Sequence, residues 1–287
     1  MKWLVTGARG MLGSDVCTTL AERGIEHTPV GRDELDLTDD DAVVRALVGH
    51  AVVVNCAAWT AVDLAETHED EAFEVNAAAA GRLARAAYDA GALVVQVSTD
   101  YVFDGDARSP YAEDAPLRPR SAYGRTKAAG ESAVREAAPG GHLIVRTGWL
   151  YGANGSSFPR TIARVARERG SLDVVDDQVG QPTWTRDVAD LVVRLVQAGV
   201  PSGAWHATSG GETSWYGFAR EVVAAAGMSP EIVRATDSTA FRRDAVRPAY
   251  SVLGHDRLVE HGIEPIGPWQ DRWAVAASEV LGTDRPG

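Results

Sequence analysis

The sequence predicts an α/β fold with a doubly wound parallel sheet, and two features of its hydrophobic pattern support this prediction. Short apolar runs such as A-V-V-V-N-C-A and A-L-V-V-Q-V-S lack period-two polarity, which is typical of strands covered on both faces. Segments of helical character separate these runs, as crossover helices separate parallel strands. With 287 residues, 45% of them hydrophobic, the chain is long enough to bury a sizeable core.

The expected elements alternate along the first half of the chain. The first strand is K-W-L-V-T, the first helix is D-V-C-T-T-L-A-E-R-G and the second strand is H-T-P-V. Further strands are A-V-V-V-N-C-A, A-L-V-V-Q-V-S and H-L-I-V-R-T, and a loop containing Gly, Asn and Ser, Y-G-A-N-G-S-S, follows them. We therefore expect a first domain over residues 1–150, rejoined by about 184–210, and a smaller interleaved C-terminal lobe formed by 151–183 and 211–287.

Composition narrows the possible functions. The net charge of -12, from 28 basic and 40 acidic residues, disfavours binding to nucleic acid. The apolar run at the N-terminus is too short for a signal peptide, and no stretch approaches the roughly 18 apolar residues of a membrane span. Cys17 and Cys56 form no disulfide framework or metal-ligand spacing, and we interpret them as reduced core residues. We expect a cytoplasmic protein whose partner is a small molecule.

A glycine-rich segment, T-G-A-R-G-M-L-G, connects the first strand to the first helix. Gly7, Gly10 and Gly13 have GxxGxxG spacing, which allows a tight turn and lets a dinucleotide pyrophosphate approach the amides of a helix N-terminus. An ordinary glycine-rich turn between a strand and a helix is the alternative. The position of the motif favours a Rossmann-type dinucleotide-binding domain over residues 1–150.

Gly31 and Arg32 follow the second strand, where a dinucleotide site contacts the adenosine ribose. The guanidinium of Arg32 is suited to a 2′-phosphate, which favours NADPH over NADH. Two alternatives stay open: Asp33 binds the ribose hydroxyls instead, or Arg32 is simply solvated.

The segment S-A-Y-G-R-T-K-A-A-G-E indicates a catalytic pair, because Tyr123 and Lys127 lie four residues apart and share one face of a helix. Lys2 and Lys127 are the only lysines of the chain, beside 26 arginines, so a solvated helix face would be expected to use arginine. Lysine is a compact, titratable cation that lowers the pKa of a neighbouring phenol and hydrogen-bonds a ribose. We therefore expect Tyr123 to act as an acid with Lys127 beside it.

The stretch V-V-Q-V-S-T-D-Y-V-F-D-G places Ser98 and Thr99 at the end of a buried strand, one strand-helix unit before Tyr123. Ligands of α/β sheets bind outside the carboxyl ends of the strands, so a hydroxyl here is placed to hydrogen-bond the carbonyl that Tyr123 protonates. As the alternative, both residues are turn caps.

Taken together, these motifs resemble those of an extended short-chain dehydrogenase/reductase, and more narrowly those of the dTDP-4-dehydrorhamnose reductase family, along nearly the whole chain. T-G-A-R-G-M-L-G and N-C-A-A-W-T-A-V-D-L-A-E are similar to cofactor segments of the family. The most specific matches are V-S-T-D-Y-V-F-D-G, the P-Y-x-E-D region and Y-G-R-T-K-A-A-G-E. R-T-G-W-L-Y-G, D-D-Q-V-G-Q-P-T and R-P-A-Y-S-V-L resemble motifs of its substrate-binding lobe, here 151–183 and 211–287.

The resemblance implies roles for individual residues. The implied catalytic residues are Thr99, Tyr123 and Lys127. The expected substrate contacts are Thr99, Asp100, Trp149 and Arg247, the last with the substrate diphosphate. The expected cofactor contacts are Gly7, Gly10, Met11, Leu12, Gly13, Arg32, Asp36, Leu37, Ala58, Trp59, Thr60, Tyr123 and Lys127.

The implied reaction is reduction of the C4 ketone of a dTDP-4-keto-6-deoxysugar by NADPH, with NADH as a second option. The foremost substrate is dTDP-4-dehydrorhamnose, which would give dTDP-rhamnose, and a related deoxysugar is the alternative. A non-catalytic NADP-binding regulatory subunit shares the fold, but the intact set of Thr99, Tyr123 and Lys127 argues against it. A sugar-nucleotide dehydratase or epimerase shares it too, but Tyr101 follows Asp100 where resembling dehydratases have an Asp-Glu pair.

Two further positions bear on properties of the family. Ser157 and Phe158 stand where many relatives have an Asn-Phe pair, so a polar contact to substrate or cofactor is expected to differ. Some relatives dimerise through a divalent metal held by acidic residues, and Asp15 lies in a comparable place. We expect Asp15 to be a solvated surface carboxylate and predict no metal. The protein is expected to be a monomer or a homodimer.

Overall fold

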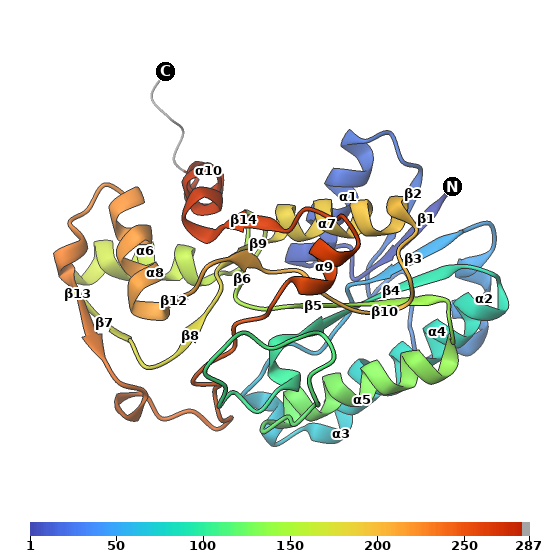
Figure 1. The fold of residues 1–287 in the computed structure, drawn as a ribbon, viewed down its shortest axis with the longest axis horizontal. Coiled ribbons are helices and arrows are strands. Elements are labelled where there is room, and N and C mark those ends of the chain that lie inside the picture. Colours follow the sequence, from blue (N-terminus) through green and yellow to red (C-terminus); the bar gives the residue numbers. More distant parts are fainter. Residues whose placement is uncertain (283–287) are drawn as a thin grey trace.

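A six-stranded parallel sheet forms the centre of the computed structural model, which describes residues 1–282 (Figure 1). The strand order is β10-β5-β4-β3-β1-β2, and every neighbouring pair is parallel. The strands are β1 (Trp3–Thr6), β2 (His27–Val30), β3 (Val52–Asn55), β4 (Leu93–Thr99), β5 (His142–Thr147) and β10 (Gly203–His206). Helices lie on both sides of the sheet, so the predicted doubly wound α/β fold is confirmed.

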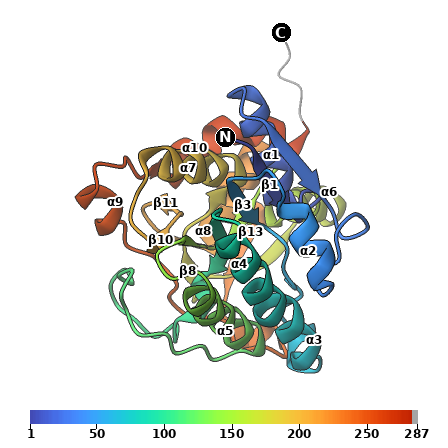
Figure 2. The same ribbon diagram turned by 90° about the vertical axis from the view of Figure 1, so that its right-hand side faces the viewer.

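Different helices cover the two faces of the sheet, as Figure 2 shows. On one face lie α1 (Met11–Glu22) and α7 (Thr185–Ala198), and on the other α2 (Asp40–Leu47), α3 (Glu69–Phe73), α4 (Ala79–Asp89) and α5 (Ala122–Ala137). Alternate residues of β1 enter different cores, because Trp3 and Val5 belong to the cluster that contains α1 and α7, whereas Leu4 belongs to the cluster of α2 and α4. Burial on both faces explains why the strands are apolar at every position.

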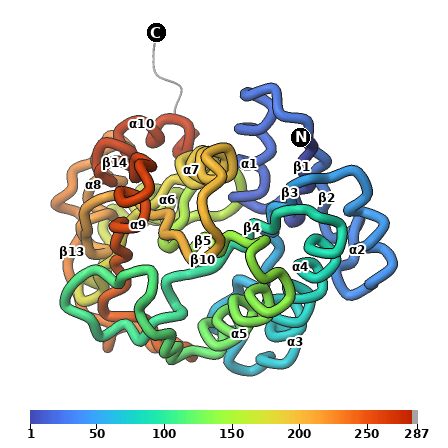
Figure 3. Tube along the Cα trace, turned by 45° about the vertical axis from the view of Figure 1, so that its right-hand side comes forward, coloured from blue at the N-terminus to red at the C-terminus, as the bar shows by residue number. Residues whose placement is uncertain are grey.

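A second, smaller core lies beside the sheet in the C-terminal half of the chain (Figure 3). Its elements are β6 (Leu150–Tyr151), α6 (Phe158–Arg169), β7 (Leu172–Val175), β8 (Val179–Gly180), β9 (Thr183–Trp184), β11 (Ser209–Gly210), β12 (Thr213–Ser214), α8 (Trp215–Ala225), β13 (Val233–Thr236), β14 (Ile266–Pro268) and α10 (Trp269–Leu281). The rings of Tyr151 and Trp273 pack against Phe218 within this core. Between β9 and β11, the chain returns to the sheet as α7 and β10.

Short helical turns and one short helix complete the description. They are the 3-10 turns Leu64–Glu66, Asp100–Val102, Pro230–Ile232 and Ser238–Ala240, the π turn Glu74–Ala78 and α9 (Asp256–Glu260). Leu258 of α9 packs into the same core as α1 and α7. Within residues 1–282, every helix is too short or too polar to span a lipid bilayer.

The start of helix α5 is determined by a capping residue and a glycine close to it in the sequence. The Ser121 side chain caps the N-terminus by accepting a hydrogen bond of 3.1 Å from the Gly124 amide. Gly124 packs so closely on the Tyr101 carbonyl that a Cβ would overlap it. Because only glycine permits this approach, α5 lies directly against the turn that follows β4.

Candidate functional site

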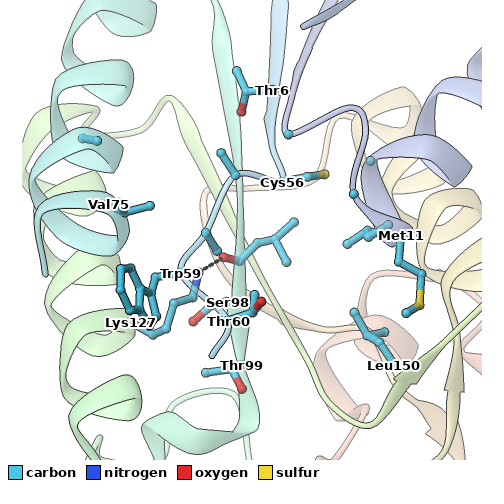
Figure 4. Close-up of a pocket in the computed structure, with 18 of the residues that line it drawn as sticks. Thr6, Met11, Cys56, Trp59, Thr60, Val75, Ser98, Thr99, Lys127 and Leu150 are labelled. Carbon is cyan, nitrogen blue, oxygen red and sulfur yellow. Dashed lines mark hydrogen bonds between the residues drawn. The ribbon is translucent and has the colours of Figure 1, made fainter. Parts of the chain in front are cut away.

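A cavity of about 800 Å³ opens at the carboxyl ends of the parallel strands (Figure 4). Segments that follow β1, β2, β3, β4 and β5 line it, because parallel strands bring their carboxyl ends to one edge of a sheet. Lys127 of α5 lies on one side, and Met11 and Leu150 lie on the opposite side (Figure 4). All residues predicted to contact the cofactor, and all three predicted catalytic residues, line this one cavity.

The glycine-rich loop forms one wall of the cavity at the N-terminus of α1. Gly7 has a φ of +64°, and a Cβ there would lie 2.6 Å from the Ala57 amide nitrogen. A Cβ on Gly13 would lie 2.8 Å from the Gly7 carbonyl carbon, so both positions require glycine. Gly10 caps α1 in an extended conformation, and the first turn of the helix contains no acidic residue. The loop therefore leaves room and unopposed backbone amides for a pyrophosphate.

The residues predicted to lie near the adenosine ribose line the same cavity beyond β2. Arg32, Asp36 and Leu37 are among the lining residues, whereas Asp33, the alternative ribose ligand, is not. Asp36 accepts hydrogen bonds from the amide and hydroxyl of Thr38 at 2.9 and 2.8 Å, which lower the pKa of its carboxyl group. The exposed Arg32 guanidinium is a lining group suited to a 2′-phosphate, and Arg9 is a second arginine that lines the cavity.

Some lining residues were not predicted from the sequence. Arg9 lies within the glycine-rich loop and forms an ion pair of 2.5 Å with Glu34. Its position inside the loop motif could have predicted that it lines the cavity. Cys56 follows β3, and burial raises the pKa of its thiol to about 12, so the thiol is neutral at physiological pH. Apolar residues such as Leu150 give no such signal, because an apolar side chain near a site looks like any core residue.

Lys127 connects α5 to β4. The residue is 4% exposed, and its Nζ donates a hydrogen bond of 2.7 Å to the Val97 carbonyl. Burial lowers the pKa of Lys127 to about 8, and the negative charge of Glu131 opposes this effect. Because Tyr123 precedes Lys127 by four residues, it lies on the same face of α5, beside the cavity.

The phenol of Tyr123 is held in its protonated form. Burial raises its pKa to about 12, the Thr99 hydroxyl lowers it, and the Asp100 carboxyl raises it. We expected Lys127 to lower this pKa, whereas the opposing influence in this structure comes from Thr99. The Tyr123 ring meets Tyr101 edge to face, with 5.6 Å between ring centroids. A neutral phenol that lines a cavity is able to donate a proton there.

Ser98 and Thr99 both lie at the end of β4 but have different hydrogen-bond partners. Ser98 is 3% exposed and donates a hydrogen bond of 2.7 Å to Oε1 of Glu131. Thr99 donates to Oδ1 of Asp100 at 2.9 Å and accepts from the Tyr101 amide at 3.2 Å. The Ser98 hydroxyl is thus occupied. Both residues line the cavity, and Thr99 also caps the turn Asp100–Val102, as the alternative interpretation expected for it.

Asp100 and Trp149 line the part of the cavity next to the lobe. Asp100 is buried, and its Oδ2 has no hydrogen-bond partner among residues 1–282. Burial raises the pKa of its carboxyl group to about 6, and the neighbouring hydroxyls of Ser251 and Thr99 oppose this rise. Trp149 has a φ of +49°, rare for a bulky residue, and its ring stacks on Trp215 with 3.5 Å between centroids. An unpartnered oxygen beside an aromatic face suits a polar ring such as a sugar.

Arg247 is not among the residues that line the cavity. Its Nη2 donates a hydrogen bond of 2.8 Å to Oδ2 of Asp63, and its Nη1 is buried without a partner in the described part of the chain. Asp63 also accepts a hydrogen bond of 3.2 Å from the Ala245 amide. The neighbouring Arg242 and Arg243 are exposed. The ion pair therefore attaches the segment around Arg247 to the loop that follows β3.

The expectation of a solvated Asp15 is wrong. This residue is 3% exposed and accepts hydrogen bonds from Thr185 and from Asn154, the latter at 3.4 Å. Burial raises the pKa of its carboxyl group. The enclosure arises because the start of α7 and the loop after β6 pack onto α1. Among residues 1–282, no group of three or more His, Cys, Asp or Glu side chains is arranged to hold a metal.

Comparisons with known proteins agree with one another. The RmlD substrate binding domain family matches residues 1–281. A Streptomyces antibioticus protein named probable dTDP-4,6-dihydroxy-2-methyloxan-3-one 4-ketoreductase is 48% identical, over 100% of this chain and 98% of its own. The dTDP-4-dehydrorhamnose reductase of Streptomyces griseus is also 48% identical, and the match covers 94% of this chain and 90% of that protein. A structure of dTDP-4-dehydrorhamnose reductase from Bacillus anthracis in complex with NADP is 33% identical, with a TM-score of 0.92 over 96% of this chain and 98% of that one.

Proposed function

Because the chain belongs to the RmlD substrate binding domain family, we propose that this oxidoreductase uses NADPH to reduce the C4 ketone of a dTDP-4-keto-6-deoxysugar. The observation that supports the proposal is the meeting of Thr99, Tyr123 and Lys127 at a cavity that also contains a glycine-rich loop. Tyr123 is the proton donor, with Thr99 and Lys127 beside it, and the glycine-rich loop is a binding site for a dinucleotide.

The residues present fit a nicotinamide dinucleotide. Gly7 and Gly13 leave no space for a Cβ, which is the backbone arrangement that a pyrophosphate needs for close approach. Arg32 is assigned to the 2′-phosphate, and Lys127 to the nicotinamide ribose. When bound, NADPH supplies the hydride for the ketone carbon.

The protein's part in the reaction is to bind, orient and protonate the ketone. Tyr123 donates its phenol proton to the C4 oxygen as negative charge develops there, since its raised pKa keeps it protonated at neutral pH. The Thr99 hydroxyl, which donates to Oδ1 of Asp100 in this structure, turns its proton to the same oxygen and thereby polarises the carbonyl. Lys127 places a positive charge beside the phenolate that forms.

The substrate is assigned to the side of the cavity next to the lobe. The indole of Trp149 provides an apolar face for the sugar ring, and Asp100 accepts a hydrogen bond from a sugar hydroxyl. We also assign Arg247, which lies outside the lining of the cavity, to the diphosphate, because its buried Nη1 has no partner among residues 1–282 while Asp63 holds Nη2. We assign dTDP-4-dehydrorhamnose as the foremost substrate, and a related 4-keto-deoxysugar as the second, because relatives named as reductases of each kind match 94% and 100% of the chain.

The proposal is tested by incubating the protein with a panel of dTDP-4-keto-sugars and following NADPH by its absorbance. Oxidation of NADPH that depends on one of these sugars, with the corresponding C4 alcohol as product, is the expected result. The Lys127→Met variant is the control for background oxidation. Binding of NADPH without turnover of any sugar would point to a non-catalytic subunit. Loss of water from a dTDP-hexose without net NADPH oxidation would point to a dehydratase.

A further inference from the structure

A buried carboxylate lies one helical turn beyond the predicted catalytic pair. Tyr123, Lys127 and Glu131 are spaced four residues apart on α5 and therefore share one face of the helix. The Glu131 side chain is fully buried, and its Oε1 accepts hydrogen bonds from Ser98 Oγ at 2.7 Å and Arg146 Nε at 2.8 Å. Its Oε2 accepts from Arg146 Nη2 and from Arg135 Nη2, both at 2.8 Å. A carboxylate with four such partners is held in one orientation.

Arg146, the main partner of Glu131, is itself fixed from several sides. It is 1% exposed, and Nη1 donates a hydrogen bond of 2.8 Å to the Glu113 carbonyl. Its guanidinium carbon lies 5.1 Å from the centre of the Phe103 ring. The adjacent His206 is neutral, because burial lowers its pKa to about 3. Arg146 therefore anchors Glu131 to β5, and the neutral His206 adds no charge to this ion pair.

The contacts of α5 fall on consecutive residues at the end of β4. Lys127 binds the Val97 carbonyl, Glu131 binds the Ser98 hydroxyl, and Tyr123 lies beside Thr99. One residue before Glu131, the Cα of Gly130 packs so closely on the Asn76 carbonyl that a Cβ would overlap it. The helix therefore contacts both β4 and the π turn Glu74–Ala78, and Glu131 is its hydrogen-bonded anchor to β4.

From this arrangement we propose that Glu131 is a positioning residue for the reaction. It holds α5 in register with the end of β4, so that Tyr123 and Lys127 face Thr99, and it supplies the negative charge that faces Lys127. The inference rests on the proposed function, because it concerns the geometry and charge of the same proton-donating site.

The charges around Lys127 support the electrostatic part of this role. Burial lowers the pKa of Lys127, and Glu131 is the first group that opposes this effect. Cys56, which also faces the ammonium, has a neutral thiol because burial raises its pKa to about 12. Asp100 faces Tyr123 from the β4 side. Arg146 and Arg135 bind the far side of the Glu131 carboxylate and partly neutralise it. Removing the Glu131 charge therefore leaves Lys127 with less compensation for its burial.

The chain offers a direct measurement of this effect, because Lys2 and Lys127 are its only lysines. Selective carbon-13 labelling of lysine gives two side-chain signals, whose shifts with pH report the pKa of each residue. In Glu131→Gln, which preserves side-chain shape, we expect the Lys127 midpoint to fall by about one pH unit. The Lys2 signal should titrate as in the wild type. An unchanged Lys127 midpoint in a folded Glu131→Gln protein would overturn the electrostatic role.

Kinetics provide a second readout. If the midpoint of Lys127 is lower by one pH unit in Glu131→Gln, about a tenth of Lys127 is protonated at pH 8, instead of about half in the wild type. At pH 8, kcat/KM of the variant should therefore be about fivefold lower than that of the wild type. Near pH 6 the difference should be small, because Lys127 is mostly protonated in both proteins. Glu131→Asp, which keeps the charge on a shorter side chain, should restore the pH dependence but leave kcat below that of the wild type. Ser98→Ala should lower kcat at every pH without moving the alkaline limb.

The matched control is Asp187→Asn, which removes a carboxylate that binds Arg272 through two hydrogen bonds of 2.8 and 2.7 Å, away from the cavity. It should lower thermal stability while leaving the Lys127 midpoint and the pH profile unchanged. Equal kinetic losses in Asp187→Asn and Glu131→Gln at all pH values would reduce Glu131 to a stability role. If Glu131→Gln does not fold, the double variant Glu131→Leu/Arg146→Met avoids an unpaired buried Arg146 and is titrated in the same way.

Two failures are distinguishable in these measurements. If the wild type turns over no keto-sugar, the proposed function is wrong, and the titration of Lys127 still tests the effect of Glu131. If the wild type is active but the Lys127 midpoint and the pH profile of Glu131→Gln match it, the proposed function stands and the role of Glu131 does not.

Discussion

Gly180 lies against the ring of Trp149, and an added methyl group there tests whether the indole positions the sugar. In Gly180→Ala, the Cβ would lie 2.5 Å from Nε1 and 2.7 Å from Cζ2 of the indole. Ordinary contact begins at 3.4 Å, so the indole has to move by about 0.9 Å or more. Its freedom is small, because the ring is stacked on Trp215 and its backbone is held at a φ of +49°.

The size of the effect follows from this displacement. A misplacement of about 1 Å in a residue that positions substrate costs up to about 100-fold in rate, so we expect kcat/KM for the keto-sugar to fall by about 10- to 100-fold. Most of the loss should come from a higher KM, since the proposed role of Trp149 is to contact the sugar and not the transferred proton. The strain of overpacking should lower the free energy of unfolding by about 1–3 kcal/mol.

The assay is steady-state kinetics with the sugar nucleotide varied, together with a separate titration of NADPH binding and thermal unfolding. Gly267→Ala is the control, because a Cβ there meets only Arg272 Cδ at 3.8 Å, an ordinary contact. NADPH affinity should stay close to that of the wild type. The reasoning is refuted if Gly180→Ala keeps the wild-type KM for the sugar, or if it loses NADPH affinity and not sugar affinity.

The remaining predictions concern single groups of the site. Tyr123→Phe should fold and bind NADPH but lose about 10²- to 10⁴-fold in kcat, and near-normal turnover would exclude it as the acid. Arg32→Ala should weaken NADPH binding more than NADH binding, and an unchanged preference would assign the ribose to another group. Arg247→Ala should raise KM for the sugar nucleotide with NADPH binding unchanged; the opposite pattern would move Arg247 to the cofactor site. Because the Lys127 pKa of about 8 lies below its ordinary value, the residue loses its proton above this pH, and kcat/KM should fall there. A plateau that extends well above pH 8 would contradict the proposed role of the ammonium.

The predicted elements of the first half were found because each depends on residues close together in the chain. The run H-L-I-V-R-T forms β5, and K-W-L-V-T contains β1. The four-residue spacing of Tyr123 and Lys127 placed both on one face of α5, as helical geometry requires. The order of strand, glycine-rich turn and helix was enough to place Gly7 and Gly13 beside the cavity.

The partners of Ser98 and Thr99 became clear only from the packing of α5 on β4. Both are hydroxyl residues at the end of one strand, and their order along the chain does not say which one faces α5 at Glu131. The pairing of β4 with β5 and the packing of α5 direct Ser98 to the Glu131 carboxylate and leave Thr99 near Tyr123. These partners are a tertiary feature, because they depend on how α5 packs against the end of β4.

Local spacing determined the strands of the sheet, the glycine-rich turn and the shared helix face of Tyr123 and Lys127, since these depend on φ and ψ preferences and on periods of two or 3.6 residues. Only the tertiary structure decided which distant charges meet. Asp63 and Arg247 are 184 residues apart, and Asp15 and Thr185 are 170 residues apart. No spacing rule relates such pairs, because their distance depends on how whole elements pack. Burial then changes their chemistry, which is why Asp15, expected in water, is an enclosed carboxyl group with a raised pKa.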